Sequence, residues 1–145
     1  MIVVDSSAVI AVLFDEPEAP ACIAALNAAR TRLMSAANYV ETGTVLADRL
    51  HKGPRTKAQD VLDDFLAVLH IDIAPVEHET ARRALAARLT FGQGFGTRGG
   101  LNFGDCFAYA LATQHAAPLL YVGNDFARTD ITSALQGTKK RTIRR

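Results

Sequence analysis

Short apolar runs alternate along the chain with longer stretches in which apolar residues recur every three or four positions. The runs predict strands buried on both faces of a sheet, because few polar residues interrupt them. The longer stretches predict amphipathic helices. The expected strands are residues 2–4, 32–34, 71–76 and 119–122. The expected helices are residues 8–14, 18–30, 36–51, 57–69, 77–89 and 102–115.

This order of elements predicts a single three-layer α/β/α domain, in which helices cover both faces of a central parallel sheet. We expect the domain to occupy residues 1–138 and a basic C-terminal tail to follow over residues 139–145. Ser6 or Ser7 is the expected N-cap of the first helix, and Ser35 that of the helix beginning at residue 36.

The composition of the chain excludes several classes of protein. The chain has 145 residues, of which 49% are hydrophobic, and a formal net charge of +1. This balance excludes a disordered chain, and no apolar run approaches the roughly 20 residues that cross a membrane. Asp5 interrupts the apolar start of the chain, which argues against a secretory signal. Cys22 and Cys106 lie in apolar helical contexts that are typical of reduced thiols, so we expect a cytoplasmic protein with no membrane partner.

Four of the fifteen acidic residues lie where a solvated charge is not expected. Asp5 directly follows the first expected strand, and Asp125 lies just past the last one. Glu41 shares the apolar stripe of its helix, and Asp105 opens another helix. Because ligand sites in open α/β sheets form beyond the carboxyl ends of the strands, we expect these four carboxylates to converge there.

Each acid also has a simpler explanation. Asp5 and Asp125 can cap a following helix, and Asp105 can complement the dipole at its helix N-terminus. Glu41 is harder to explain, because a carboxylate on an inward stripe is destabilising by several kcal/mol unless it is paired or metal-bound. Converging carboxylates repel one another, and Mg²⁺ or Mn²⁺ would relieve this repulsion through oxygen ligands. The pattern indicates metal-assisted hydrolysis of a phosphodiester.

Because the net charge is close to zero, contact with a nucleic acid must come from local basic patches. One candidate is the tail, with Lys139, Lys140, Arg141, Arg144 and Arg145, and the other is Arg49, His51, Lys52, Arg55 and Lys57. Either patch can instead be a solvated end or loop. The glycine-rich residues 91–100 lack the strand–turn–helix context of a nucleotide-binding loop. We interpret them as a flexible loop in which Arg98 is a weak candidate for contact with a substrate phosphate.

Five segments in matching order resemble a PIN-domain ribonuclease, and more narrowly the VapC toxins of bacterial type II toxin–antitoxin pairs. They are IVVDSSA (residues 2–8), YVE (39–41), LNFGDCFA (101–108), GNDF (123–126) and TDI (129–131). The resemblance implies a PIN-like α/β/α fold. It also implies an endoribonuclease that cleaves structured RNA, such as tRNA or rRNA, and that commonly forms a homodimer inhibited by a VapB-like antitoxin.

The resemblance further implies a catalytic site that binds Mg²⁺ or Mn²⁺ through Asp5, Glu41, Asp105 and Asp125. The ion would activate a water molecule for attack on a backbone phosphate. Asp130 matches a further acid of the family and is expected to support the metal ligands from behind. Ser7 is expected either to hydrogen-bond a ligand carboxylate or water, or to cap its helix.

Two other classes of protein also fit the sequence. A phosphatase or phosphoacceptor domain would also place an acid after its first strand, but position 7 is Ser where one such class has a second Asp. A catalytically inactive PIN-like module that binds RNA or protein is the main alternative. The apolar residues 8–14 and 19–26 would offer such a module, or an active toxin, a surface for a dimer or an antitoxin.

Overall fold

The chain folds around one parallel sheet. The computed structural model describes residues 1–50, 52–95 and 99–135. Its strands are β1 (Ile2–Val4), β2 (Arg32–Ser35), β3 (Ile71–Ala74) and β4 (Leu119–Leu120). They lie in the order β3-β2-β1-β4, and every pair is parallel. Strands β2 and β3 lie on one side of β1, and β4 lies on the other, so the strand order switches beside β1.

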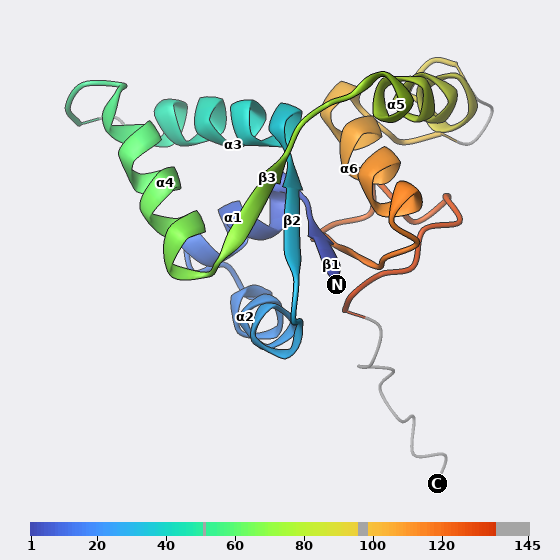
Figure 1. Ribbon diagram of the computed structural model, residues 1–145. Helices are drawn as coiled ribbons and strands as arrows, with labels where there is room; N and C mark the ends of the chain where they lie inside the picture. The colour runs from blue at the N-terminus through green and yellow to red at the C-terminus, as the bar shows by residue number, and fades with distance from the viewer. Residues whose placement is uncertain (51, 96–98, 136–145) are drawn as a thin grey trace, which may run out of the picture.

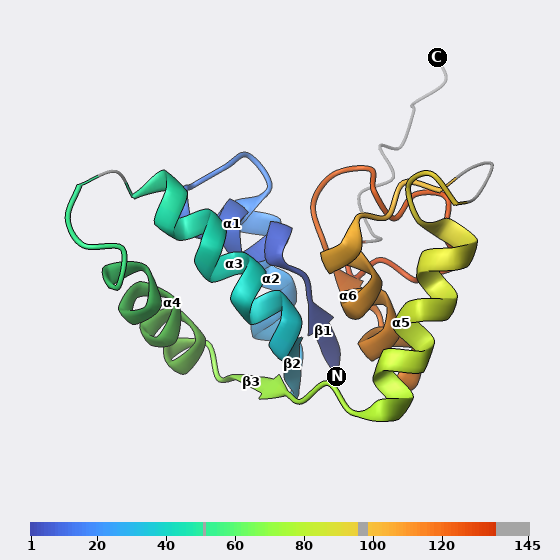
Figure 2. The ribbon, with the colours of Figure 1, turned by 90° about the horizontal axis from the view of Figure 1, so that it is seen from above.

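Helices cover both faces of this sheet. They are α1 (Ser6–Leu13), α2 (Ala19–Ala28), α3 (Ala36–Arg49), α4 (Lys57–Val68), α5 (His78–Phe91) and α6 (Phe103–Gln114). Figures 1 and 2 show α1 to α4 on one side of the strands and the paired helices α5 and α6 on the other. The predicted three-layer α/β/α class with a parallel sheet is confirmed.

Strand β1 explains why the two faces have separate cores. Its side chains alternate between the faces, so Val4 packs in the cluster formed with α1 to α4, and Val3 packs in the cluster formed with α5 and α6. Ile2, Val3 and Val4 are all buried, as expected for an uninterrupted apolar strand in the middle of a sheet. This burial fixes the end of β1, and therefore the position of Asp5.

The structure corrects the predicted N-cap of the first helix. Neither Ser6 nor Ser7 caps α1, which begins at Ser6; the cap is Asp5, whose carboxylate accepts a hydrogen bond from the Ser7 backbone N–H. The prediction failed because both serines already lie within the helix. Ser35 is confirmed as the N-cap of α3, since its Oγ accepts from the backbone N–H of Ala37.

Two strands end earlier than predicted. Strand β3 stops at Ala74 because Pro75 has no N–H to donate to the neighbouring strand. Strand β4 stops at Leu120, and the backbone N–H of Val122 donates instead to the Ser7 hydroxyl, 3.0 Å away. The chain therefore leaves the sheet just before Asp125.

The glycine-rich segment is more ordered at its ends than a free loop would be. Gly92 and Leu101 form an isolated parallel bridge, and the backbone N–H of Gln93 donates to the Leu101 carbonyl. Arg98, the tail 139–145 and the expected domain boundary at residue 138 lie outside the described residues. Among the residues that are described, no helix is both long and apolar enough to cross a membrane.

Candidate active site

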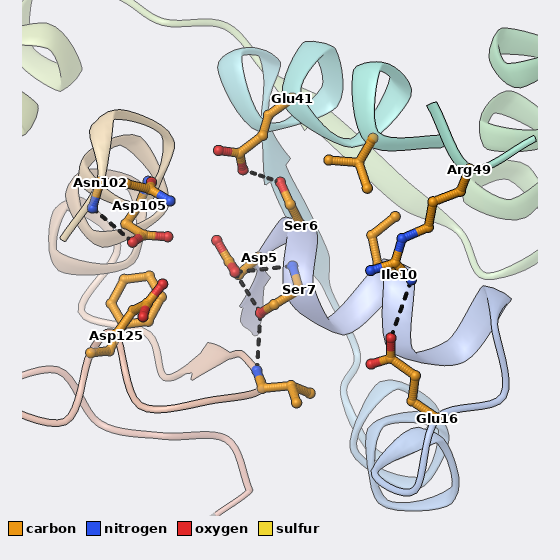
Figure 3. A pocket seen from close by; sticks show the side chains of 13 residues that line it. Asp5, Ser6, Ser7, Ile10, Glu16, Glu41, Arg49, Asn102, Asp105 and Asp125 are labelled. Carbon is orange, nitrogen blue, oxygen red and sulfur yellow. Dashed lines mark hydrogen bonds and ion pairs between the residues drawn. The ribbon is translucent and has the colours of Figure 1, made fainter. Parts of the chain in front are cut away.

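A pocket of about 340 Å³ opens where the strand order switches, beyond the carboxyl ends of β1 and β4. Such switch points are where open α/β sheets bind ligands. Asp5, Glu41, Asp105 and Asp125 all line this pocket, although they come from four separate segments of the chain. Figure 3 shows the four carboxylates around one end of the pocket.

Asp5 is the most constrained of the four acids. Its side chain is only 3% exposed, and Oδ2 accepts hydrogen bonds from the backbone N–H of Ser7 (3.1 Å) and from the Ser7 hydroxyl (2.6 Å). Oδ1 is buried and has no hydrogen-bond partner among the described residues. Burial raises the pKa of Asp5 to about 6, even though the bonds from Ser7 oppose this shift.

Ser7 links the ends of the two central strands. Its hydroxyl accepts from the backbone N–H of Val122, just past β4, and donates to Asp5, just past β1. The bond from Val122 occupies the hydroxyl as an acceptor and leaves its proton for Asp5. Of the two roles considered for Ser7, the structure therefore shows the contact with a carboxylate rather than a helix cap.

Asp105 is held by the start of α6. It occupies the third position of that helix and forms a capping box with Asn102: the Asn102 side chain accepts from the Asp105 backbone N–H at 2.8 Å, and Asp105 Oδ2 accepts from the Asn102 backbone N–H at 2.9 Å. Burial raises the pKa of Asp105 to about 8, and the negative charges of Asp5 and other pocket acids add to the shift. Asp105 therefore caps the N-terminus of α6 and also lies beside the other carboxylates of the pocket.

Glu41 is fixed by two neutral side chains, Ser6 and Asn38, whose contacts with it the sequence did not predict. Ser6 Oγ donates to Glu41 Oε1 at 2.5 Å. The amide of Asn38, one helical turn earlier, donates to the same oxygen at 3.3 Å and to the Gly104 carbonyl at 3.0 Å. The signal available in the sequence was a polar Asn one turn before Glu41 on the same stripe, but its partner on α6 is visible only in the fold.

Gly104 creates the space that Glu41 occupies. A Cβ atom at this position would lie 1.7 Å from Glu41 Oε2, so any other residue would displace the carboxylate. Gly104 directly precedes Asp105, and α3 and α6 therefore approach each other closely through these residues. The absence of a side chain at position 104 is part of the site.

Asp125 is the most exposed of the four. It lies in the loop after β4, and none of the described residues that follow it, 126–135, is helical, so the alternative role as a helix N-cap is wrong. The loop is anchored by the next residue, Phe126, which is buried and packs against Tyr121 with ring centroids 4.8 Å apart. The backbone of Gly100 lies against that of Asp125.

Asp130 does not line the pocket. Its carboxylate instead accepts a hydrogen bond from the Tyr109 hydroxyl on the exposed side of α6. Burial and the neighbouring carboxylate raise the pKa of Tyr109. The contact shown for Asp130 is thus with Tyr109, and its expected role behind the metal ligands stays a prediction.

The pocket acids suit a hard divalent cation. Among the described residues, the buried Asp5 Oδ1 has no hydrogen-bond partner, and burial together with the charges of the neighbouring carboxylates raises the pKa values of Asp5 and Asp105. All the donors are oxygen atoms, which Mg²⁺ and Mn²⁺ prefer. As the side chains stand, the described residues contain no three acidic, His or Cys groups close enough to hold an ion together. Binding of a metal ion would therefore require the carboxylates to move closer together.

Comparison with known proteins places the chain beside one family. Residues 2–131 match the model of the PIN domain. The chain is 44% identical over 133 residues to a protein named Ribonuclease VapC28 from Mycobacterium tuberculosis, covering 92% of this chain and 97% of that protein. It is 38% identical to Ribonuclease VapC of Mycolicibacterium smegmatis, covering 90% and 98% of the two chains.

A solved structure shows the same fold. The chain superposes with a TM-score of 0.70 on Mycobacterium tuberculosis VapC20, described as a sarcin-ricin loop cleaving toxin, at 14% identity and covering 91% of this chain and 97% of that one. At this identity the likeness concerns the fold alone.

Proposed function

The chain belongs to the PIN-domain family and, within it, to the VapC ribonucleases, and we propose that it is a divalent-metal-dependent endoribonuclease that acts as the toxin of a toxin–antitoxin pair. The expected substrate is structured RNA such as tRNA or rRNA. We further propose a cytoplasmic protein that forms a homodimer and is inhibited by a VapB-like antitoxin.

One observation carries the proposal: four carboxylates from separate segments line a single pocket, and the two most buried of them have raised pKa values. Raised carboxyl pKa values in a cleft are typical of functional sites. A stable fold has no need to gather like charges, because the repulsion between them is destabilising. The arrangement is therefore best explained by a cation that is bound during function.

Asp5 and Asp105 would hold Mg²⁺ or Mn²⁺, with Glu41 and Asp125 binding it directly or through water. When bound, the ion supplies a more acidic water and stabilises the negative charge that develops on a phosphate. Ser7 orients Asp5 through Oδ2 and leaves Oδ1 available. Because metal ligands must be deprotonated, uptake of the ion would expel protons from Asp5 and Asp105 and would be favoured by a rise in pH.

The neutral side chains have a distinct part in this proposal. Ser6 and Asn38 hold Glu41 by donating hydrogen bonds to one of its oxygens. Groups that orient metal ligands in this way typically contribute 10- to 100-fold, in order of magnitude, to metal affinity or activity. Asn38 also bonds to the Gly104 carbonyl, so Glu41 and the start of α6 are held in register.

The test is cleavage of total cellular RNA by the purified chain, with Mg²⁺ or Mn²⁺ and with a chelator, followed by mapping of the cut ends. We expect discrete metal-dependent cuts, loss of cleavage in Asp105→Asn, and full activity in the control Asp64→Asn, an exposed acid on α4. In parallel, either metal at a hundredfold excess over its Kd should stabilise the fold by about 2.7 kcal/mol. If the metal stabilises the protein but RNA stays intact, the proposed nuclease activity is refuted. An inactive module that binds RNA or protein would then be favoured.

A further inference from the structure

The pocket extends beyond the four carboxylates. Its other end is lined by Ile10, Glu16, Val45 and Arg49, and Figure 3 shows the Arg49–Glu16 pair across the pocket from the acids. Helix α3 runs along both ends, because Glu41, Val45 and Arg49 follow one another at intervals of four residues and so lie near one side of the helix. Eight residues of helix place Arg49 roughly 12 Å from Glu41 along the axis.

Arg49 is the one cationic side chain among the described residues that line this pocket. Its nearest charged partner is Glu16, with 3.4 Å between Arg49 Nη1 and Glu16 Oε1. The guanidinium also lies over the ring of Phe14, 5.0 Å from its centre. The ring and the carboxylate position the group, while 47% of the Arg49 side chain stays exposed.

This positioning leaves most of the guanidinium free to bind a ligand. A guanidinium has five N–H donors in a planar fork, and the contact with Glu16 uses one nitrogen. The fork matches the geometry of phosphate oxygens, and an arginine stacked on an aromatic ring is already oriented for such a contact. The ligand that this end of the pocket suits is therefore an anion with several oxygen atoms.

The charge of the pocket explains why such a contact matters for RNA. The polyanionic backbone must approach four carboxylates, and a divalent ion among them offsets only part of that charge. The phosphate to be cut would lie at the acidic end, whereas Arg49 is two helical turns away. Contacts of this kind position a nucleic acid without reading its sequence.

We propose that Arg49 binds a phosphate of the RNA other than the one that is cut, and that Glu16 competes with this phosphate for the guanidinium. The inference rests on the proposed ribonuclease function and assigns a substrate-positioning residue to it. Arg49 belongs to the basic patch noted in the sequence, whose member His51 lies outside the described residues; of the described members, Arg49 lines the acidic pocket.

The alternative is that the Arg49–Glu16 pair only tethers α3 to the segment after α1. A matched control exists on the other side of the sheet, where Arg83 and Glu79 of α5 form a comparable exposed pair at 3.0 Å. Arg83 is 43% exposed and does not line the pocket. Replacing either arginine by glutamine removes one charge and one exposed pair, and Arg49→Gln also removes the contact with Phe14. A tethering role for Arg49 would change stability, whereas a role in RNA binding would change the affinity for RNA and its dependence on salt.

The first experiment measures binding in an Asp5→Asn background, so that bound RNA is not cut. The probe is a fluorescein-labelled single-stranded RNA 20-mer, titrated in Mg²⁺ at several salt concentrations. We expect Arg49→Gln to raise the Kd about tenfold and to reduce the slope of log K against log salt by about 0.7, the value for one phosphate contact on a single strand. Arg49→Lys should restore the slope and only part of the affinity, and Glu16→Gln should lower the Kd about twofold. Arg83→Gln should match the parent protein.

The second experiment separates failure of this inference from failure of the proposed function, using cleavage of total RNA by the otherwise unmodified chain. We expect Arg49→Gln to raise KM and leave kcat at saturating RNA unchanged. If the unmodified chain cleaves RNA and Arg49→Gln behaves like Arg83→Gln, the role of Arg49 is refuted while the nuclease stands. A fall in kcat with unchanged KM also refutes it. If the unmodified chain neither binds nor cleaves RNA, both proposals fall.

Discussion

The four carboxylates at the acidic end of the pocket form two pairs that are held in different ways. Asp5 and Asp105 are buried, and each is bonded to backbone N–H groups at the start of a helix, α1 for Asp5 and α6 for Asp105. Glu41 and Asp125 are more exposed; Glu41 is held by neutral side chains, and Asp125 lies in a loop. The buried pair is placed by the backbone, whereas the exposed pair can adjust to a ligand.

Burial also changes the titration of the buried pair. The pKa is raised to about 6 for Asp5 and to about 8 for Asp105, because burial disfavours their charged forms. These two groups therefore depend most on a bound cation, and we expect their removal to have the largest effects on activity. Substitutions that displace Glu41 or neutralise Asp125 should reduce activity by smaller factors.

Asp5→Asn should have the largest effect and reduce RNA cleavage by on the order of 10³-fold or more, because it removes a charged metal ligand at the most constrained position. Asn is as good an N-cap as Asp, so α1 should form normally. Cleavage rates and circular dichroism check both statements. Undiminished cleavage by a folded Asp5→Asn protein would show that Asp5 is not required for catalysis.

Asp105→Asn should abolish cleavage to a similar degree and also stabilise the metal-free protein at pH 8. The folded state keeps a proton on Asp105 up to about pH 8, whereas the unfolded chain releases it near pH 4. The free energy of unfolding should therefore fall as pH rises between these values, and Asn removes this loss. We expect a gain on the order of 1–2 kcal/mol, or about 3–6 °C in Tm.

Thermal unfolding of both proteins between pH 4 and pH 9, with chelator and with Mg²⁺, measures this effect. The unmodified chain should lose stability with rising pH in chelator, Asp105→Asn should lose less, and Mg²⁺ should offset the loss only in the unmodified chain. A metal-free curve that rises toward pH 8 would contradict the assignment of a raised pKa to Asp105.

Gly104→Ala should have an intermediate effect and reduce cleavage about 10- to 100-fold while the fold persists. The new Cβ would occupy the place of Glu41 Oε2, and the flexible carboxylate would move away. The matched control is Gly43→Ala in α3, where the nearest atom to an added Cβ is Leu62 Cδ2 at 3.7 Å. That control should keep its activity and gain up to about 1 kcal/mol from helix propensity. Equal activity of the two variants would show that the position of Glu41 is unimportant.

Asp125→Asn should have the smallest effect, a loss of up to about tenfold, since water can replace an exposed carboxylate as a metal ligand. The measurement is the Mg²⁺ concentration that gives half-maximal cleavage, which should rise while the rate at saturating Mg²⁺ changes little. A loss as large as that of Asp5→Asn would place Asp125 with the buried pair and erase the distinction between the pairs.

Several features of the fold and site were predictable from local patterns. Ile2, Val3 and Val4 form an uninterrupted apolar strand, which identified a buried strand and, by position, the acid at its end. The PIN-domain resemblance is confirmed by the family match over residues 2–131. The roles of the four acids stay predictions, although the structure shows them in one pocket.

Other features depended on contacts between distant segments. Asn38 bonds across to the Gly104 carbonyl, and neither residue carries a local signal for this contact. Asp130 matches the family pattern, but the Tyr109 hydroxyl binds it outside the pocket. Arg49 was one of several basic residues in a row, and only the packing of α3 beside α1 places it at the edge of the acidic pocket.

The order of strands and helices, and the acids that end strands, were determined by the amino-acid pattern alone, because burial and periodicity act over a few neighbouring residues. Tertiary structure decided the neighbours of β1, the hydrogen-bond donors that hold Glu41 and the position of Arg49 at the pocket. These features depend on segments that are distant in the sequence but meet in the fold, as Ser6 and Glu41 do, and no local pattern records which partner a side chain will find there.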